Sequence, residues 1–430
     1  MRKIVNFIII FVVTFSLFSY KTEAKSSLSA ISADGIVLMD ATTGEILYSK
    51  NMDTQYPPAS TTKIMTALLT LENCKLDDVI TVGKNPPNAD GSKIYLFQGE
   101  SIKVKDLLYA LMLQSANDAA EALAEHISGS TTEFAKLMNK RAIELGATNT
   151  NFVNPHGLYD ENHRTTAKDL ALILKELAKH KEFKEIATTS MYYIEPTNKS
   201  PEKRPLWNKN NLIQKKSKYY YEGSEGGKTG YTVQSKHSYV AIASRNNQKL
   251  IAVLLHDTKH TYWTDVRVLF DYGFQNFTLK PLYLKGDPVE KFTIDDNSSI
   301  PLLAGEDFYY VAQKNSTELP KVTINNKPLD RKSFSRGENI LTATVTYKDK
   351  NIGTLNLASS VDHSSKNLLP SLSGKSGNKS MSTVKVALYI LITLFIILFL
   401  LRLRKKRLMK KRHKRNKIIK DYRERYKDEE

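Results

Sequence analysis

The fold of this chain is decided by the stretch Pro57-Pro58-Ala59-Ser60-Thr61-Thr62-Lys63-Ile64-Met65-Thr66-Ala67-Leu68-Leu69. Two prolines end an extended segment, and an apolar run with helical spacing begins directly after them. Because proline is tolerated before a helix or in its first turn but not further inside, the pattern predicts a helix from about Ser60 to about Leu71. Ser60 and Lys63 then lie one turn apart on the same face of that helix.

This placement suits a nucleophile. The helix dipole and the free backbone N–H groups favour negative charge near Ser60, and a buried Lys63 with a lowered pKa can accept the hydroxyl proton. The S-x-x-K pattern alone also fits an ordinary helix start, and it recurs at Ser200–Lys203, Ser376–Lys379 and Ser382–Lys385. None of these copies begins a soluble amphipathic helix. Whether Ser60 is a nucleophile or only a helix start therefore depends on the other motifs in the chain.

Composition narrows the class of protein. A chain of 430 residues with 41% hydrophobic residues exceeds one average domain and can bury a substantial core. The single cysteine, Cys74, excludes an intrachain disulfide framework and a paired-cysteine metal or redox site. We therefore predict no metal and no cofactor.

The first 24 residues are typical of a signal peptide. Arg2 and Lys3 form the charged start, residues 4–18 form the apolar region, and Thr22-Glu23-Ala24 is a small-residue cleavage site. An uncleaved N-terminal membrane anchor is the alternative.

A second apolar segment, residues 384–403, is close to the length of about 20 residues that a membrane-spanning helix needs. Residues 402–430 hold 15 lysine and arginine residues against five acidic ones, and such a cluster stays on the cytoplasmic side. We expect a single-pass cell-membrane protein with a linker at 359–383, an extracytoplasmic ectodomain and a cytoplasmic tail at 404–430. The basic excess then reflects topology and anionic lipids, and nucleic-acid binding is not expected.

A second polar motif lies between two apolar helices. Ser115-Ala116-Asn117 interrupts a helix that ends near Leu113, and a new helical pattern resumes at Ala119. Such short polar residues can simply form a turn with an N-cap. Between two buried helices, however, their side chains can also point into a cleft with fixed geometry.

A third motif, Lys228-Thr229-Gly230, lies on a strand that is followed by an antiparallel hairpin at 239–255. It offers a cation, a hydroxyl and a glycine that lets a ligand lie against the backbone. A nucleotide-binding P-loop is excluded because its first glycine would fall at position 222, which is Glu222.

The remaining pattern predicts further elements. We expect a hairpin at 36–49, a helix at 132–145, a capped helix at 166–177, polar loop structure at 190–222 and a helix at 263–272 that ends at Gly273. From about residue 277 to 358 the sequence consists of short strand-like runs, in which apolar and polar residues alternate, separated by polar turns. This pattern predicts a separate β domain.

The three motifs occur in this order in penicillin-binding proteins and related β-lactamases. The chain therefore resembles a low-molecular-mass penicillin-binding protein of the D-alanyl-D-alanine carboxypeptidase family over about residues 28–360, including the loop Asn154-Pro155-His156-Gly157-Leu158. The resemblance implies an α+β, serine β-lactamase/DD-peptidase-like domain at 25–276. This has an antiparallel sheet with helices on both faces plus a helical cluster, and a small all-β domain follows at 277–358.

The resemblance also implies roles. Ser60 would attack the carbonyl between the last two D-alanines of a peptidoglycan stem peptide, with Lys63 as base and Ser115 relaying a proton to the leaving amine. The implied substrate-binding residues are Asn117, Lys228, Thr229, Gly230, Tyr231 and Thr232. Among these, Lys228 and Thr229 would bind the terminal carboxylate, with Thr232 assisting, and the backbone N–H groups of Ser60 and Tyr231 would form the oxyanion hole. β-Lactam antibiotics would act as covalent inhibitors.

The sequence differs from the family pattern at two places, and three other functions are alternatives to a carboxypeptidase. Ala116 stands where glycine is common, and no arginine aligns near Lys259-His260-Thr261-Tyr262, where some relatives direct one at the substrate carboxylate. A β-lactamase, another DD-peptidase such as an endopeptidase, and a non-catalytic wall-binding protein are the alternatives. A class A β-lactamase needs an E-x-x-x-N pattern, which does not occur between Ser115 and Lys228.

Overall fold

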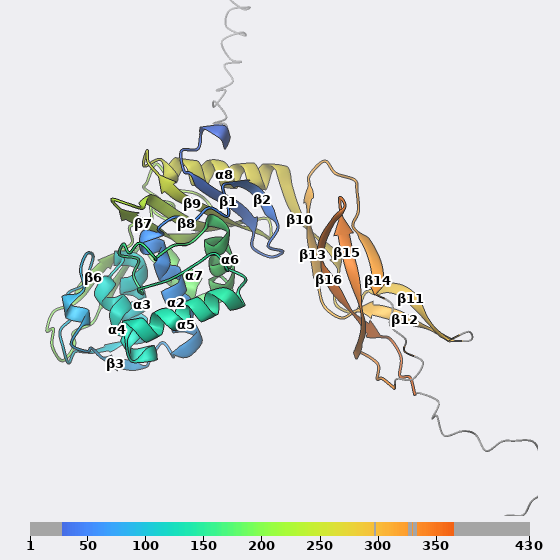
Figure 1. Ribbon diagram of the computed structural model, residues 1–430, viewed down its shortest axis with the longest axis horizontal. Coiled ribbons are helices and arrows are strands. Elements are labelled where there is room, and N and C mark those ends of the chain that lie inside the picture. The colour runs from blue at the N-terminus through green and yellow to red at the C-terminus, as the bar shows by residue number, and fades with distance from the viewer. Residues whose placement is uncertain (1–27, 296–297, 326–328, 330–332, 365–430) are drawn as a thin grey trace, which may run out of the picture. The chain divides into compact units, whose positions relative to one another are not determined.

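The computed structural model describes residues 28–295, 298–325, 329 and 333–364 (Figure 1). The predicted signal peptide at 1–24, transmembrane helix at 384–403 and cytoplasmic tail at 404–430 lie outside these residues, as does most of the linker at 359–383. Within the described part of the chain, no helix is both long enough and apolar enough to cross a membrane.

The N-terminal part is built on a five-stranded antiparallel sheet in the order β2-β1-β9-β8-β7. The strands are β1 (Gly35–Asp40), β2 (Ile46–Lys50), β7 (Ser224–Thr232), β8 (Lys236–Arg245) and β9 (Gln248–Asp257). The predicted hairpins at 36–49 and 239–255 are therefore present. Strand β7 lies at one edge of the sheet, so one side of its backbone is open to other partners.

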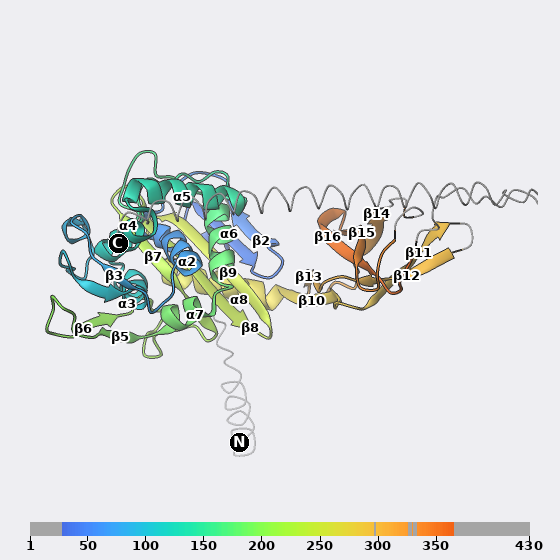
Figure 2. The same cartoon turned by 90° about the horizontal axis from the view of Figure 1, so that it is seen from below.

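Helices cover both faces of this sheet (Figures 1 and 2). Ile36 and Leu38 of β1 pack toward α8 on one face, whereas Val37 and Met39 pack toward α2 and α6 on the other. A central strand buried on both faces carries apolar residues without alternation, as β1 does. The helices are α2 (Lys63–Asn73), α3 (Val104–Tyr109), α4 (Asn117–Ser128), α5 (Thr131–Glu144), α6 (Ala167–Leu177), α7 (Lys181–Thr188) and α8 (Tyr262–Asn276).

Short elements connect these helices and strands. Three short helices are η1 (Leu28–Ala30), η2 (Ala59–Thr62) and η3 (Pro86–Asn88), and η4 (Ala110–Gln114) is a π-helical turn. Two small hairpins are β3 (Val79–Thr81) with β4 (Ser101–Lys103) and β5 (Met191–Ile194) with β6 (Arg204–Trp207).

Two sequence predictions are wrong in detail. Residues 190–222 contain the β5–β6 hairpin rather than loop structure alone. Helix α8 continues to Asn276 instead of ending at Gly273, because that glycine lies inside the helix against Leu250 and Leu38, where a Cβ would be only 2.5 Å from Leu250 Cδ1. Here the glycine provides close packing and does not stop the helix.

The C-terminal part is all β, as predicted. One sheet has the order β11-β12-β16-β15-β14, and β10 pairs with β13 in a second sheet. Its strands are β10 (Phe277–Tyr283), β11 (Pro288–Asp295), β12 (Ser298–Ala304), β13 (Phe308–Gln313), β14 (Lys321–Asn325), β15 (Asn339–Tyr347) and β16 (Lys350–Ser359). Alternating inward residues such as Leu341, Ala343 and Val345 bury its core, and together these observations confirm the predicted α+β architecture.

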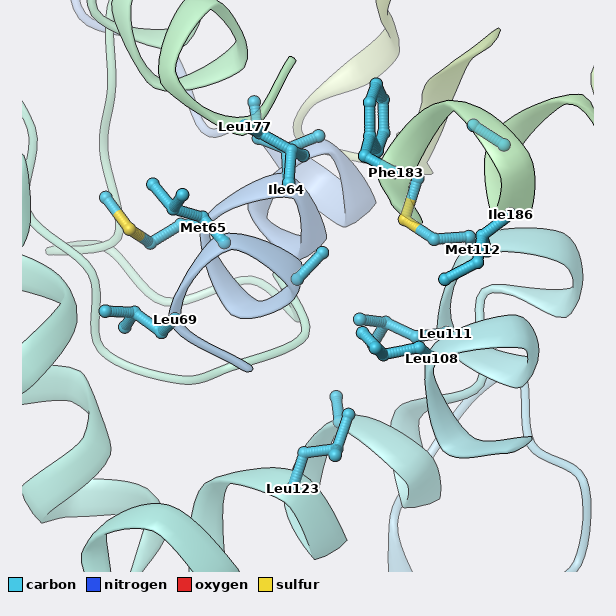
Figure 3. Close-up of a cluster of buried hydrophobic side chains, with 14 of the residues drawn as sticks. Ile64, Met65, Leu69, Leu108, Leu111, Met112, Leu123, Leu177, Phe183 and Ile186 are labelled. Carbon is cyan, nitrogen blue, oxygen red and sulfur yellow. The ribbon is translucent and has the colours of Figure 1, made fainter. Parts of the chain in front are cut away.

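The helical cluster packs around α2, whose first residue is Lys63 (Figure 3). Ile64, Met65 and Leu69 of α2 meet side chains from five other elements, and all of them belong to one buried core. These partners are Leu108 of α3, Leu111 and Met112 of η4, Leu123 of α4, Leu177 of α6, and Phe183 and Ile186 of α7. The core therefore fixes the position and direction of the helix that carries Lys63.

Shortening a buried side chain of this core should destabilise the folded protein. Leu123 is fully buried in the cluster, so Leu123→Ala should lower the free energy of unfolding by about 2–5 kcal/mol through lost burial and a residual cavity. Urea unfolding followed by circular dichroism measures the change. Ile143→Ala is the control because Ile143 on α5 is 66% exposed and its loss should have little effect. Equal effects of the two substitutions would contradict this description of the core.

Candidate active site

Ser60 lies in the 3₁₀ turn η2, which continues directly into α2. The turn is held by its own hydroxyls, since Thr61 Oγ1 donates to Pro58 O at 2.7 Å and Thr62 Oγ1 donates to Ala59 O at 2.8 Å. Ala59, Thr61 and Thr62 are buried, whereas Ser60 is half-buried. The turn therefore presents the Ser60 side chain from an otherwise closed surface.

The Lys63 side chain is completely buried and its amine has three close oxygen partners. Nζ lies 3.1 Å from Ser60 Oγ, 2.6 Å from Asn117 Oδ1 and 2.7 Å from the His156 carbonyl oxygen. The amide and carbonyl oxygens can only accept hydrogen bonds. A neutral amine has two N–H bonds and one lone pair, so it can donate to these two oxygens and direct the lone pair at the Ser60 hydroxyl.

The surroundings of Lys63 favour that neutral form. Burial lowers the pKa of Lys63 well below its ordinary value, and the positive charge of Lys228 lowers it further. The carboxylate of Asp118 acts in the opposite direction and is the weaker influence. Burial disfavours the charged form of an amine, which is how a lysine becomes a base near neutral pH.

Asn117 reaches the site from a break between two helices, and Ser115 lies in the same break. The π-helical turn η4 ends at Ser115, which has the left-handed conformation φ 61°, ψ 32°, and α4 begins at Asn117. The predicted interruption is therefore present. Asn117 is fixed on its other side because its Nδ2 donates to Asp90 O at 2.6 Å, and its backbone N–H donates to Ser92 O at 2.6 Å.

Asp118 supports this break, and the sequence motifs did not identify it. Its buried carboxylate accepts hydrogen bonds from the backbone N–H groups of Ile94 and Leu96, which fixes the preceding loop against α4. Burial raises the pKa of Asp118, while these N–H groups act against the increase. Asp118 thus connects the loop that contacts Asn117 with the helix that carries Asn117.

The third motif lies on the edge strand β7. Lys228 is only 4% exposed and its Nζ donates to Thr229 O at 2.8 Å. Burial, with the charge of Lys209, lowers the pKa of Lys228 to about 7. Thr229 is half-buried beside it on β7.

Gly230 brings β7 against the turn that carries Ser60. A Cβ at this position would lie 2.8 Å from the Ser60 backbone nitrogen, which no real side chain allows. The absence of a side chain leaves the Ser60 N–H beside the backbone of β7, next to Tyr231. Tyr231 itself is 57% exposed. Thr232 Oγ1 bonds to Ser235 at the end of the strand, so its hydroxyl stabilises the β7–β8 turn.

The loop at 154–158 closes the site from the side of α2. Asn154 Oδ1 accepts from Gly157 N at 2.7 Å, and the His156 carbonyl contacts Lys63 as described above. The His156 ring lies 3.3 Å from Glu121 and its pKa is lowered mainly by burial. His156 therefore contributes its backbone oxygen to Lys63, a role that no side-chain motif could predict.

The structure thus brings Ser60, Lys63 and Asn117 together by direct hydrogen bonds and places Gly230 against the Ser60 backbone, with the charge of Lys228 near enough to act on Lys63. No cluster of three or more His, Cys, Asp and Glu side chains that could hold a metal ion occurs in the described ranges. His256 and His260 have a four-residue spacing, but His256 contacts Asp34 at 2.6 Å and stacks on Tyr56, whereas His260 stacks on His237.

Comparison with known proteins agrees with this geometry. Residues 21–259 match the D-alanyl-D-alanine carboxypeptidase family, and residues 277–365 match the C-terminal domain of penicillin-binding protein 5. The chain is 37% identical over 286 residues to the D-alanyl-D-alanine carboxypeptidase DacF of Bacillus subtilis, covering 65% of this chain and 72% of that protein. It is 31% identical over 367 residues to DacC of Escherichia coli, covering 80% and 84%.

A solved structure is similar to this chain over both the N-terminal and the C-terminal parts. Penicillin-binding protein 5 of Haemophilus influenzae superimposes with a TM-score of 0.65 and 30% sequence identity, covering 77% of this chain and 97% of that one.

Lys228 should make stability depend on pH. Its pKa is about 7 in the folded protein and near 10.5 when unfolded, so between these values the unfolded chain binds a proton that the folded protein does not. Wild-type stability therefore falls as the pH decreases from about 10.5 to about 7. Lys228→Met removes this penalty and should raise the melting temperature near pH 7, with a smaller gain near pH 10. Lys84→Met, at an exposed lysine, is the control. A gain that is equal at both pH values would contradict the prediction.

Gly157 should be intolerant of a side chain. It has φ +87°, and a Cβ would lie 1.8 Å from the Ala59 carbonyl oxygen, so Gly157→Ala must displace the Ser60 turn. We expect a loss of about 2–4 kcal/mol in the free energy of unfolding. Gly129→Ala is the matched control, because Gly129 has φ +78° but no atom within 4 Å of the added Cβ, and it should cost only about 1 kcal/mol. Similar losses measured by urea unfolding would show that the close approach is unimportant.

Proposed function

The chain belongs to the D-alanyl-D-alanine carboxypeptidase family, and from this membership we propose that it removes the terminal D-alanine from peptidoglycan stem peptides through an acyl-enzyme on Ser60. The observation that carries the proposal is the contact of Ser60 Oγ with a buried Lys63 amine whose two other partners are acceptors. A serine next to a base is the arrangement that nucleophilic acyl transfer requires.

In the first half of the reaction, Ser60 Oγ attacks the carbonyl carbon between the two D-alanines. The hydroxyl proton passes to Lys63 Nζ as the O–C bond forms. The C–N bond then breaks, and the D-alanine amine leaves with that proton, which Ser115 relays from Lys63 Nζ so that the lysine amine is neutral again. In the second half, water attacks the ester and Lys63 accepts a proton from that water. The C–Oγ bond of the ester then breaks, and Lys63 returns the proton to Ser60 Oγ.

The developing oxyanion needs two donors. The backbone N–H groups of Ser60 and Tyr231 are proposed for this role, since Gly230 lets β7 approach the Ser60 nitrogen. Loss of one such donor in an acyl-transfer site costs about 2.7–4 kcal/mol of transition-state stabilisation. Asn117 would hold the substrate backbone while it orients Lys63, and Lys228 and Thr229 would face the terminal carboxylate. β-Lactams, whose ring amide Ser60 would open in the same way, are the corresponding covalent inhibitors.

A β-lactamase is less well supported. The matched family and the relatives named above are carboxypeptidases, and the chain also matches the C-terminal domain that accompanies penicillin-binding protein 5. The intact Ser60 and Lys63 pair likewise favours an enzyme over a non-catalytic wall-binding protein.

We further propose that the enzyme works outside the cytoplasmic membrane. The apolar N-terminal segment, the uncharged run at 386–401 and the cluster of lysines and arginines that follows support secretion and a single C-terminal span. Such an anchor would keep the active site near newly made peptidoglycan.

Release of D-alanine tests the proposal. The full-length protein should release D-alanine from a peptide that ends in D-Ala-D-Ala, and Ser60→Ala should lower the rate by at least about 10³-fold. Ser200→Ala is the control because Ser200 opens another S-x-x-K pattern, yet its Oγ bonds only locally to Glu202 O. Release that survives in Ser60→Ala would refute the assignment of the nucleophile. Cleavage of cross-linked peptides without release of terminal D-alanine would indicate an endopeptidase.

A further inference from the structure

A cavity of about 370 Å³ lies beside the helix break that contains Ser115. One wall is the loop at 93–95, and another is the segment at 200–206, which includes the first residues of β6. Gln114 also lines the cavity, and it is the last residue of η4, directly before Ser115. The cavity therefore borders the break from which Asn117 reaches Lys63.

Hydrogen bonds hold both walls in place. The backbone N–H groups of Ile94 and Leu96 donate to the Asp118 carboxylate, at 3.0 and 3.1 Å, which ties the loop to α4. Further along the chain, the buried Glu100 carboxylate accepts from both terminal nitrogens of Arg204, at 2.7 and 2.9 Å. The loop, α4 and the start of β6 are thus joined to one another, so a ligand meets a preformed cavity and spends little of its binding energy on ordering it.

Four charged side chains line the cavity, and two of them have an ionic partner. Arg204 is paired as described above, and Lys203 Nζ lies 2.9 Å from Glu195 Oε1. The ammonium of half-buried Lys93 and the carboxylate of exposed Glu202 have no side-chain hydrogen bond or ion pair to any residue that the structure describes. Within the described ranges, the cavity thus offers one cation and one anion to a ligand.

The uncharged lining suits a ligand with an apolar stem. Leu206 is buried and provides apolar surface, whereas the Gln114 amide is half-buried and Tyr95 is 71% exposed. Neither the Gln114 amide nor the Tyr95 hydroxyl has a hydrogen bond within the part of the chain that the structure describes. A ligand can therefore place methylene groups against Leu206 and a polar end at the amide and the two charged groups.

The cavity is close enough to the reaction to receive a neighbouring side chain of the substrate. Asn117 is the residue proposed to hold the substrate backbone beside the reacting carbonyl. Consecutive Cα atoms are about 3.8 Å apart, so the Cα of Gln114 lies at most about 11 Å from that of Asn117. The residue before D-Ala-D-Ala is one such step from the acyl D-alanine, and a side chain of five atoms adds about 6 Å. The end of that side chain can therefore reach the cavity.

We propose that this cavity binds the side chain of the stem-peptide residue that precedes D-Ala-D-Ala, and that it selects a side chain ending in both an ammonium and a carboxylate group. This inference rests on the proposed function. The Lys93 ammonium donates to the carboxylate, and the Glu202 carboxylate accepts from the ammonium. The Gln114 amide has both donors and an acceptor and can bond to either group. The preferred substrates thus contain a diaminodicarboxylic acid at this position, and peptides with lysine there react more slowly.

Three acyl donors separate the contributions of the two charges. They are N-acetylated peptides X-D-Ala-D-Ala in which X is meso-diaminopimelate, L-lysine, which lacks the distal carboxylate, or L-2-aminopimelate, which lacks the distal ammonium. Release of D-alanine by the full-length protein gives kcat/KM for each peptide. The wild type should prefer the diaminopimelate peptide about tenfold over the lysine peptide and about threefold over the aminopimelate peptide, because Lys93 is half-buried and Glu202 is exposed.

Each substitution should remove one preference only. Lys93→Met should lower kcat/KM of the diaminopimelate peptide to that of the lysine peptide, with the value for the lysine peptide nearly unchanged. Glu202→Gln should remove the preference over the aminopimelate peptide and keep the preference over the lysine peptide.

Lys203→Met is the matched control, because Lys203 lines the same cavity but is paired with Glu195. It should keep both preferences. If it removes the preference over the lysine peptide as fully as Lys93→Met does, the general positive charge is responsible and the inference is wrong. Equal rates for all three peptides in the wild type, or an equal slowing of all three in Lys93→Met, would also overturn it. If the wild type releases D-alanine from none of the peptides, the proposed function itself fails.

Discussion

The buried amine of Lys63 is the constraint on which the rest of the structure depends. A lysine side chain taken out of water must either lose its charge or find strong partners, because the charged form is costly in a dry interior. Here the amine has an amide oxygen, a backbone carbonyl oxygen and the Ser60 hydroxyl around it. Each partner comes from a different element, so the position of Lys63 requires α2, the start of α4 and the loop at 154–158 to be in place together.

Packing on the other side of α2 makes this arrangement possible. Lys63 is the first residue of α2, and the apolar residues that follow it belong to the largest buried core. The sheet is buried on both faces, which fixes β7 against the Ser60 turn. Gly157 and Gly230 then allow backbone approaches that any side chain would prevent. The chemistry of the site is thus local, but its geometry depends on contacts distributed over the whole N-terminal part.

The start of α2 and the break before α4 could be predicted from the sequence because the residues that indicate them are adjacent in the chain. Two prolines before an apolar helix indicate where α2 begins, and a polar break between apolar helices indicates the position of Ser115 and Asn117. Contacts that depend on tertiary structure were not predictable. The His156 carbonyl, the Asp118 carboxylate and the stack of His237 on His260 have no signature in residue type or spacing. The prediction of a helix end at Gly273 is wrong for the same reason, since only the neighbours of this glycine show that it allows close packing.

The neutral state of the Lys63 amine next to Ser60 is tested most simply by a direct titration. The full-length protein is labelled with ¹³C at lysine Cε, and the Lys63 resonance is assigned by its absence in Lys63→Met. The Lys63 pKa should lie well below the ordinary lysine value of 10.5, so the resonance should keep the shift of a neutral amine at pH values where exposed lysines are charged. A Lys63 pKa of about 10.5 would rule out this role, because a fully protonated amine could not accept the Ser60 proton.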